Sequence, residues 1–187
     1  LDDSGEGVQQ FRSDILAYAQ DSTKSIEDIN GAIYNAISAG VDYEDALGSL
    51  AEAEQLAVAT KADLNASTKT LVSTLNAYGA GSEEAAQYAE ILFETVKNGQ
   101  TTMPELANKI ANVTSIAANS GVSFDELAAA IAAVTSTGLP TSEAITSLRQ
   151  TIGNIIKPTA EAADMAEKLG IEFNAEALEA EGLKGIL

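Results

Sequence analysis

The sequence has 187 residues, 28 acidic and 10 basic, and its net charge of −18 argues against direct binding to nucleic acid or anionic lipid, because both repel an acidic chain. It contains neither Cys nor His; without these usual metal ligands and the commonest general base, we expect no cofactor, no metal site and no catalytic residue. No apolar run approaches the roughly 20 residues of a membrane-spanning helix, so no membrane span is expected, and the length suits one domain or one domain with a tail.

Three helices are predicted at the start of the chain from apolar side chains that recur at spacings of three and four. The first spans residues 8–19. Ser25 opens the second helix as an N-cap, and Gly40 ends it in a left-handed conformation. Asp42 is the predicted N-cap of the third helix. Each of these helices presents one apolar stripe to a core.

Two further helices follow, each with its own start and stop signals. Asp63 is the predicted N-cap of the fourth helix, which Gly79 closes. Ser82 starts the fifth helix, in which Glu83 and Glu84 occupy the positive first turn, and the helix runs to Gly99. Strand signals are nearly absent from the whole sequence, so the pattern predicts an all-α fold.

Two capping boxes are the sharpest local signals in the sequence. Thr102 with Glu105, and Ser123 with Glu126, each place a hydroxyl and a carboxylate three residues apart. In such a box the two side chains satisfy free backbone N–H groups reciprocally. We therefore expect a sixth helix to begin at the first box and a seventh to begin at the second.

The later helices are also delimited by Gly and Pro. The sixth reaches Gly121 and the seventh reaches Gly138. The eighth re-enters at Thr141 and stops before Pro158, since the residue that precedes a proline is disfavoured in a helix. Beyond Pro158 the pattern indicates a short Ala-rich helix and then a weak acidic one.

The predicted fold class is an all-α, multi-helix array of about eight short amphipathic helices in antiparallel hairpins. We expect a helical core domain over residues 1–157, with its N-terminal part truncated, and a linker with the start of a following segment over residues 158–187. The apolar faces are rich in Ala, which buries little surface, so the core is expected to be only modestly stable.

One short segment, which covers a helix end and the start of the next helix, occurs twice in the sequence. The sequence GVDYED at residues 40–45 reappears as GVSFDE at residues 121–126. This repeat could mark a duplicated helical hairpin. The preferred interpretation is a common local solution, in which a helix end, a cap and an aromatic residue recur independently. The sequence leaves duplication open as the alternative.

An enzymatic function would have to rest on carboxylates, the abundant reactive groups of this chain. The candidate sets are Asp42 with Glu44 and Asp45, Glu83 with Glu84, and Asp125 with Glu126. Each set falls in the first turn of a predicted helix, where acidic side chains stabilise the helix dipole by about 0.3–1 kcal/mol. A structural role therefore explains them without a substrate, and we predict that the chain is not an enzyme.

Other motifs are weaker. The calcium-binding pattern Asp-x-Asp-x-Asp-Gly does not occur. The GAGS segment at residues 79–82 has no following Lys and does not leave a strand, so it is better explained as two helix caps than as a phosphate loop. Arg149 is interpreted as a surface or interface charge.

Several segments, taken in order, resemble the core region of bacteriophage and prophage tail tape measure proteins. In the first half these are AGV at residues 39–41 and LNAYG at residues 75–79. In the second half they are GVSFDELAAAIA from residue 121, TGLPTSEA from residue 137 and IKPT from residue 156, with Leu148-Arg149 between them. The likeness covers residues 32–158, and its specificity comes from the order and spacing of the pieces.

The resemblance implies a structural protein of the virion that sets tail length and fills the tail tube during assembly. It implies the tail tube protein and tail assembly chaperones as partners, self-association into a homo-oligomer, and a place in the tail tube lumen after a period in the host cytoplasm. A helical bundle for protein–protein binding or signalling is the alternative, in which an apolar groove would recognise a partner.

Overall fold

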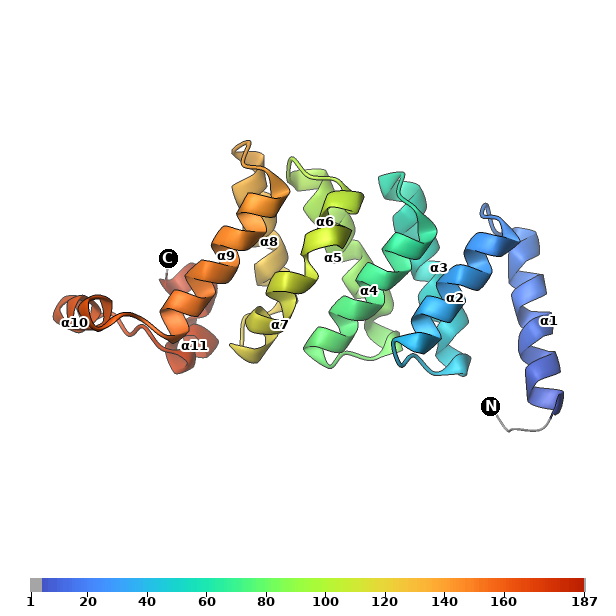
Figure 1. The fold of residues 1–187 in the computed structure, drawn as a ribbon, viewed down its shortest axis with the longest axis horizontal. Coiled ribbons are helices and arrows are strands. Elements are labelled where there is room, and N and C mark those ends of the chain that lie inside the picture. Colours follow the sequence, from blue (N-terminus) through green and yellow to red (C-terminus); the bar gives the residue numbers. More distant parts are fainter. Residues whose placement is uncertain (1–4, 187) are drawn as a thin grey trace. The chain divides into compact units, whose positions relative to one another are not determined.

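The computed structural model describes residues 5–186, which form eleven α-helices, one 3-10 turn and no strand (Figure 1). The helices are α1 Gly5–Asp21, α2 Ile26–Ser38, α3 Tyr43–Thr60, α4 Leu64–Tyr78, α5 Ala85–Asn98, α6 Met103–Lys109, α7 Ala111–Asn119, α8 Phe124–Ser136, α9 Thr141–Ile156, α10 Ala160–Leu169 and α11 Ala175–Ile186, with the 3-10 turn η1 at Ser82–Glu84. The predicted all-α class is confirmed, with eleven helices within the described range rather than about eight.

The number of helices differs for local reasons. The helix predicted from Thr102 to Gly121 is divided into α6 and α7 at Ile110. The carbonyl of Ile110 accepts hydrogen bonds from the amides of both Val113 and Thr114, at 3.0 and 3.1 Å, which tightens the backbone into a shorter turn at this point. Beyond Pro158, α10 and α11 account for the other additional helices.

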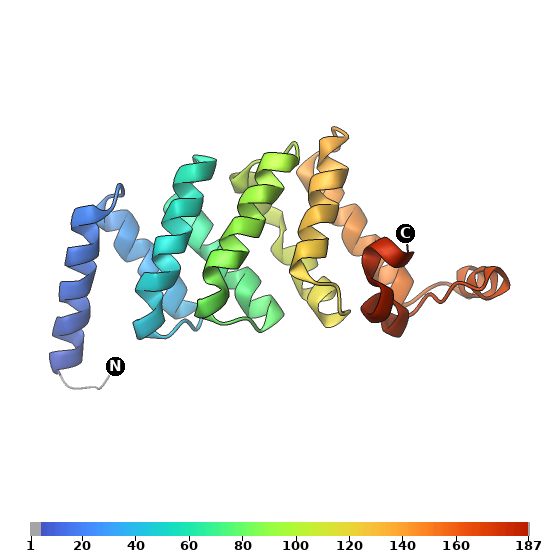
Figure 2. The same cartoon turned by 180° about the vertical axis from the view of Figure 1, so that it is seen from behind.

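The chain divides into two compact units, with the division between Glu90 and Ile91 inside α5. In the first unit α2 and α4 lie side by side, and α3 packs against both (Figures 1 and 2). Ile29 of α2, Leu50 of α3 and Leu71 of α4 are completely buried where these helices meet. This three-helix packing forms the core of the first unit.

The second unit contains a similar packing. Here α7 and α9 lie side by side and α8 packs against both (Figure 2). The buried side chains at the centre include Ile110 just before α7, Ile131 of α8 and Ile152 of α9. α6 and α11 also pack against α9.

The turn that joins the first two helices is the same in both packings. Val41 donates its backbone N–H to the carbonyl of Ala36 at 3.1 Å, and Val122 donates to Ala117 at 3.0 Å. The glycine inside each turn is left-handed, with φ of 98° at Gly40 and 75° at Gly121. The two repeated segments, residues 40–45 and 121–126, therefore begin with the same turn conformation.

The flanking core positions also correspond. Residues 81 positions apart in the two packings are buried in both, namely Ile29 and Ile110, Ala32 and Val113, Ala36 and Ala117, Ala46 and Leu127, and Leu50 and Ile131. A shared cap alone would not align buried residues on both sides of the turn. The structure thus favours duplication of the helical segment over independent use of a common cap.

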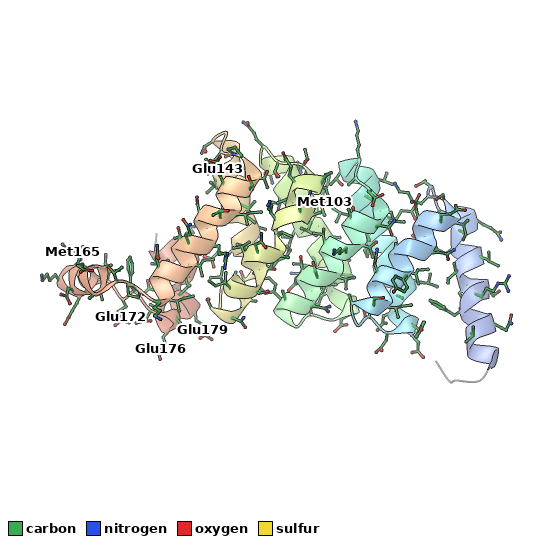
Figure 3. The ribbon with its side chains drawn as sticks, viewed as in Figure 1. Met103, Glu143, Met165, Glu172, Glu176 and Glu179 are labelled. Atoms are coloured by element: carbon green, nitrogen blue, oxygen red, sulfur yellow. The ribbon has the colours of Figure 1, made fainter. Side chains whose placement is uncertain are left out.

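The end of the chain after Pro158 contains one projecting and one packed helix. α11 lies against α8 and α9, with Leu178 and Leu183 buried, and Glu176 and Glu179 are on this helix (Figure 3). In α10, by contrast, Met165 is exposed (Figure 3). The domain boundary at Pro158 remains a prediction. No helix within the described range combines the length and the apolar character required to cross a membrane.

Candidate interaction surfaces

The carboxylates singled out from the sequence all lie at the starts of helices or of the turn η1, but few of them cap these elements. Glu84 accepts the backbone N–H of Gly81 at 3.2 Å and so caps the turn η1. Asp63 accepts the N–H of Ala66 at 2.9 Å, as predicted for an N-cap. Among residues 5–186, no group of three or more acidic side chains is placed to hold a metal ion.

The two predicted capping boxes have different outcomes. In the first, Thr102 accepts the N–H of Glu105 at 3.4 Å, and Glu105 accepts the N–H of Thr102 at 3.0 Å, so the box is complete. In the second, Ser123 accepts the N–H of Glu126 at 3.3 Å, but the carboxylate of Glu126 does not return the bond. It accepts instead the backbone N–H of Lys184 at 2.9 Å and thereby anchors α11. The prediction of a reciprocal box at Ser123 was wrong because a donor from α11 occupies the carboxylate.

Asp42 departs from its prediction in a similar way. It occupies the N-cap position of α3 with extended backbone angles, as expected, but its side chain accepts no capping hydrogen bond. The structure brings it together with Asp45 of its own acidic set and Glu83 of the second set, around one pocket of about 210 Å³ in the first unit. Two of the three acidic sets that the sequence analysis treated separately therefore share a site.

Sequence reasoning missed a buried carboxylate, Glu54, on the inner face of α3. Its oxygens accept four hydrogen bonds, from the hydroxyl of Tyr18 at 2.7 Å, the hydroxyl of Ser22 at 2.7 Å, and the amide and hydroxyl of Thr23 at 2.9 and 2.8 Å. These donors lie at the end of α1 and in the loop after it. A signal was available, since Glu54 falls four residues after the buried Leu50 and so continues the apolar stripe of α3.

The hydrogen bonds determine the ionisation of this group. Burial of Glu54 disfavours the carboxylate, but the bonds donated by Tyr18, Ser22 and Thr23 outweigh that effect and lower the pKa of Glu54 to about 2. Burial and the adjacent carboxylate raise the pKa of Tyr18. Glu54 is therefore ionised at neutral pH, where its hydrogen bonds hold the end of α1 and the following loop against α3. We call this set of hydrogen bonds the Glu54 latch.

An open groove of about 660 Å³ lies beside this latch, between α1 and α3. Its lining is mainly apolar and includes Ala17, Ala51, Ala59 and the exposed Val58. Near the middle of α1, the ring of Phe11 packs edge-on against Tyr43 with centroids 5.2 Å apart. This contact and the hydrogen bonds to Glu54 hold α1 to α3, and the groove lies between the two helices.

Residues 12–187 match the family model described as phage-related minor tail protein. The chain belongs to this family. The resemblance inferred from the sequence is thereby confirmed, and it extends further toward both ends of the chain than residues 32–158.

Three curated relatives are similar to most of this minor tail chain. A tape measure protein of Pneumococcus phage Dp-1 is 23% identical over 170 residues, which are 91% of this chain and 15% of the relative. A probable tape measure protein of Clostridium phage phiCD119 is 25% identical over 68% of this chain and 14% of the relative. A probable tape measure protein of Escherichia phage P2 is 22% identical over 91% of this chain and 21% of the relative. The chain therefore spans about a fifth or less of each relative. No solved structure matches it significantly.

Proposed function

We propose that this chain is a segment of a phage tail tape measure protein, a structural component that sets tail length and fills the tail tube during assembly. The observation that carries the proposal is that relatives named as tape measure or probable tape measure proteins, from three different phages, align with 68–91% of the chain. In this role the chain is not an enzyme, and its acidic side chains serve folding and contact with other chains.

The proposed role implies specific binding partners and a specific location in the virion. The partners are the tail tube protein and the tail assembly chaperones, and the chain self-associates. It resides in the lumen of the tail tube in the virion and in the host cytoplasm before assembly. Among the described residues the acidic surface is poorly compensated, since the ion pair between Lys97 and Glu94 is the one salt bridge they form, so basic surfaces of other chains would be favourable partners.

The polar groups of this fold are arranged so that its helices can separate at low cost. Most buried Thr side chains donate to the carbonyl one turn earlier in their own helix, as Thr68 does to Leu64 at 2.9 Å, Thr74 to Thr70 at 2.8 Å and Thr135 to Ile131 at 2.7 Å. Such bonds survive when a helix leaves its neighbours. The hydroxyls that bond across segments are exceptions, namely the buried pair Thr101 and Thr141 at 2.7 Å and the donors to Glu54. Elsewhere opening costs mainly the burial of apolar surface.

That burial is modest because much of the core consists of alanine. Ala32, Ala36, Ala53 and Ala57 in the first unit, for example, are completely buried. Each methyl group removes little area from water, and apolar burial stabilises by only about 25 cal/mol per Å². We infer that the chain folds into compact units before assembly and that their helices separate in the tail. The segment then contributes to tail length as an extended helix, at about 1.5 Å per residue.

A helical protein-binding bundle is the second candidate, and the apolar groove between α1 and α3 favours it. The groove of about 660 Å³ has room for several side chains of a partner helix. In that case the units would stay folded at work, and a partner would protect α1 and α3 from hydrogen exchange. A tape measure segment would instead associate with tail components and show low-energy opening of whole helices.

The test is an in-frame deletion of residues 5–186 from the parent gene in a propagating phage. We expect short tails or failed tail assembly by electron microscopy, since a structural part of the ruler is lost. The matched control replaces the same codons with a synonymous sequence and should give normal tails. Normal tail length and full infectivity after the deletion would contradict the proposed function.

A further inference from the structure

The polar pocket of the first unit is formed by four short segments that meet at one end of the helix packing. They are the turn between α2 and α3, the first two turns of α3, the last turns of α4, and the turn around η1. The pocket has a volume of about 210 Å³ and is lined mainly by polar atoms. Its lining includes the acidic residues Asp42, Asp45 and Glu83 and no basic residue.

Ser49 gives this pocket a second feature that does not follow from its acidic residues. Ser49 lines the pocket and is only 1% exposed, yet its Oγ has no hydrogen-bond partner among the described residues. Most other buried hydroxyls in these helices bond to a carbonyl of their own helix, as at Thr68 and Thr74. Ser67 of α4, which does not line the pocket, is likewise without a hydrogen-bond partner among the described residues. A buried polar atom without a partner destabilises the folded chain, so its presence in a pocket points to a ligand that supplies the missing bond.

Asp42 is an exposed carboxylate at the rim of the pocket that is not used for capping. It stands at the N-cap of α3 but accepts no capping hydrogen bond, although the N–H groups of the first turn are the natural donors for an aspartate there. The pocket thus combines a carboxylate that makes no capping bond with a buried hydroxyl that has no partner. Both can accept a hydrogen bond from a donor group that enters the pocket.

The second unit shows what happens when the equivalent surface is covered. Glu126 stands 81 positions after Asp45, and it accepts the backbone N–H of Lys184 from α11. At the equivalent turn, a β-carbon on Gly121 would lie 2.7 Å from Glu179 of α11, whereas one on Gly40 would meet nothing within 4 Å. The same surface therefore receives a donor-bearing helix in one unit and stays open in the other.

We propose that this pocket binds an arginine side chain presented by a partner protein chain. The guanidinium carries five N–H donors in one plane and a permanent charge, so it can pair with the carboxylates of Asp42 and Asp45 while donating to Ser49 Oγ. The binding is charge-assisted and half-enclosed, which gives it orientation as well as affinity. The proposal concerns a contact of this unit and stands independently of the tail-length role.

A bare metal ion is a poorer occupant. No group of three or more acidic side chains in the described part of the chain is placed to hold a metal. The pocket volume of about 210 Å³ is several times the roughly 30 Å³ that one water molecule occupies in the liquid. A single bare ion would therefore leave most of the pocket unfilled. A lysine ammonium would bring the charge but not the planar set of donors, so it should bind more weakly than arginine.

The test is an NMR titration of the ¹⁵N-labelled chain with N-acetyl-arginine amide as the probe. We expect saturable shifts confined to the amides of Asp42, Asp45, Ser49 and the turn around Gly81, with a dissociation constant on the order of millimolar for a single side chain. The neutral isostere N-acetyl-citrulline amide should give no saturable shifts there. N-acetyl-lysine amide and spermidine should bind at least about threefold more weakly.

Variants separate recognition from folding. D42N/D45N should weaken binding of the arginine probe at least tenfold, and S49A should weaken it about threefold while keeping both carboxylates. The control variant E44Q/D125N removes the same number of charges from exposed positions in the first turns of α3 and α8, and it should bind as the original does. Spectra of all variants without probe check that the fold is intact.

Four results would overturn the proposal. They are equal shifts with the citrulline probe, equal binding of lysine or spermidine, saturable shifts at the pocket with CaCl₂ but not with arginine, or undiminished binding by folded D42N/D45N. None of these results bears on the tail-length experiment, so a failure here is distinguishable from a failure of the proposed function.

Discussion

The packing of α2, α3 and α4 and the packing of α7, α8 and α9 share their buried positions but differ at the start of the second helix. In the first, Asp42 and Asp45 line an open pocket. In the second, Ser123 caps α8 and Glu126 holds α11. The buried positions are therefore shared, because their side chains must pack against the neighbouring helices. The exposed first turn of the second helix, α3 in one unit and α8 in the other, makes a different contact in each unit.

The largest expected effect tests the shared core. Ile29→Ala and Ile110→Ala remove equivalent side chains that are 0% and 1% exposed. Each should destabilise its own unit by about 2–5 kcal/mol, because the lost methyl groups leave a cavity in a packed core. Urea melts followed by circular dichroism measure the loss. A cost below about 1 kcal/mol at either position would break the correspondence between the two packings.

The next effect concerns the Glu54 latch, which belongs to the first unit. Glu54→Gln should make α1 open more easily by about 1–3 kcal/mol, because the amide cannot satisfy all four donors and adds donors of its own. Native-state hydrogen exchange of the α1 amides measures the change. Glu44→Gln, an exposed substitution on the same helix, should leave α1 unchanged. Equal protection of α1 in both variants would exclude the latch.

The latch also predicts a pH dependence. The pKa of Glu54 is about 2 in the folded chain, against an ordinary value of 4.5. Its contribution to stability is therefore fully present above about pH 4.5 and fades as the pH falls toward 2. Protection of α1 should decline over that range in the original chain and should be flatter in Glu54→Gln. The groups that face Glu54 are Tyr18, Ser22 and Thr23, and Asp21 lines the same groove.

A smaller effect compares the two left-handed glycines. Gly40→Ala and Gly121→Ala should each cost about 1–2 kcal/mol, because a β-carbon disfavours positive φ. Gly121→Ala should cost more, since the new β-carbon would also approach the backbone of Glu179 to 2.9 Å and displace α11. Thermal melts give the totals, and exchange at the α11 amides isolates the added term. Equal costs, with α11 undisturbed, would remove the contrast between an open and a covered turn.

The smallest effect compares the two N-caps. Ser123→Ala should destabilise by about 1 kcal/mol, because it removes the bond from the N–H of Glu126. Asp42→Ala should cost less than about 0.5 kcal/mol, since its carboxylate makes no capping bond. Urea melts of both variants provide the comparison. A larger loss at Asp42 than at Ser123 would show that Asp42 caps α3 in solution.

The sequence predicted the features that depend on neighbouring residues. Helix caps at Ser25, Asp63 and Thr102 formed as expected, because both partners of each bond lie within one turn. The features it missed join distant segments. Glu54 meets donors more than 30 residues away, and Glu126 meets a donor 58 residues away. Local spacing cannot reveal which helix supplies such a donor, so the pocket and the latch required the fold.

The most direct measurement of the ruler hypothesis is tail length in a phage whose gene carries a second, in-frame copy of residues 26–78. These 53 residues encode one complete three-helix packing, which would extend the ruler by about 80 Å if it is measured out as helix at 1.5 Å per residue. We expect electron micrographs to show tails longer by about that amount. Infectious phage with tails of unchanged length would contradict the account.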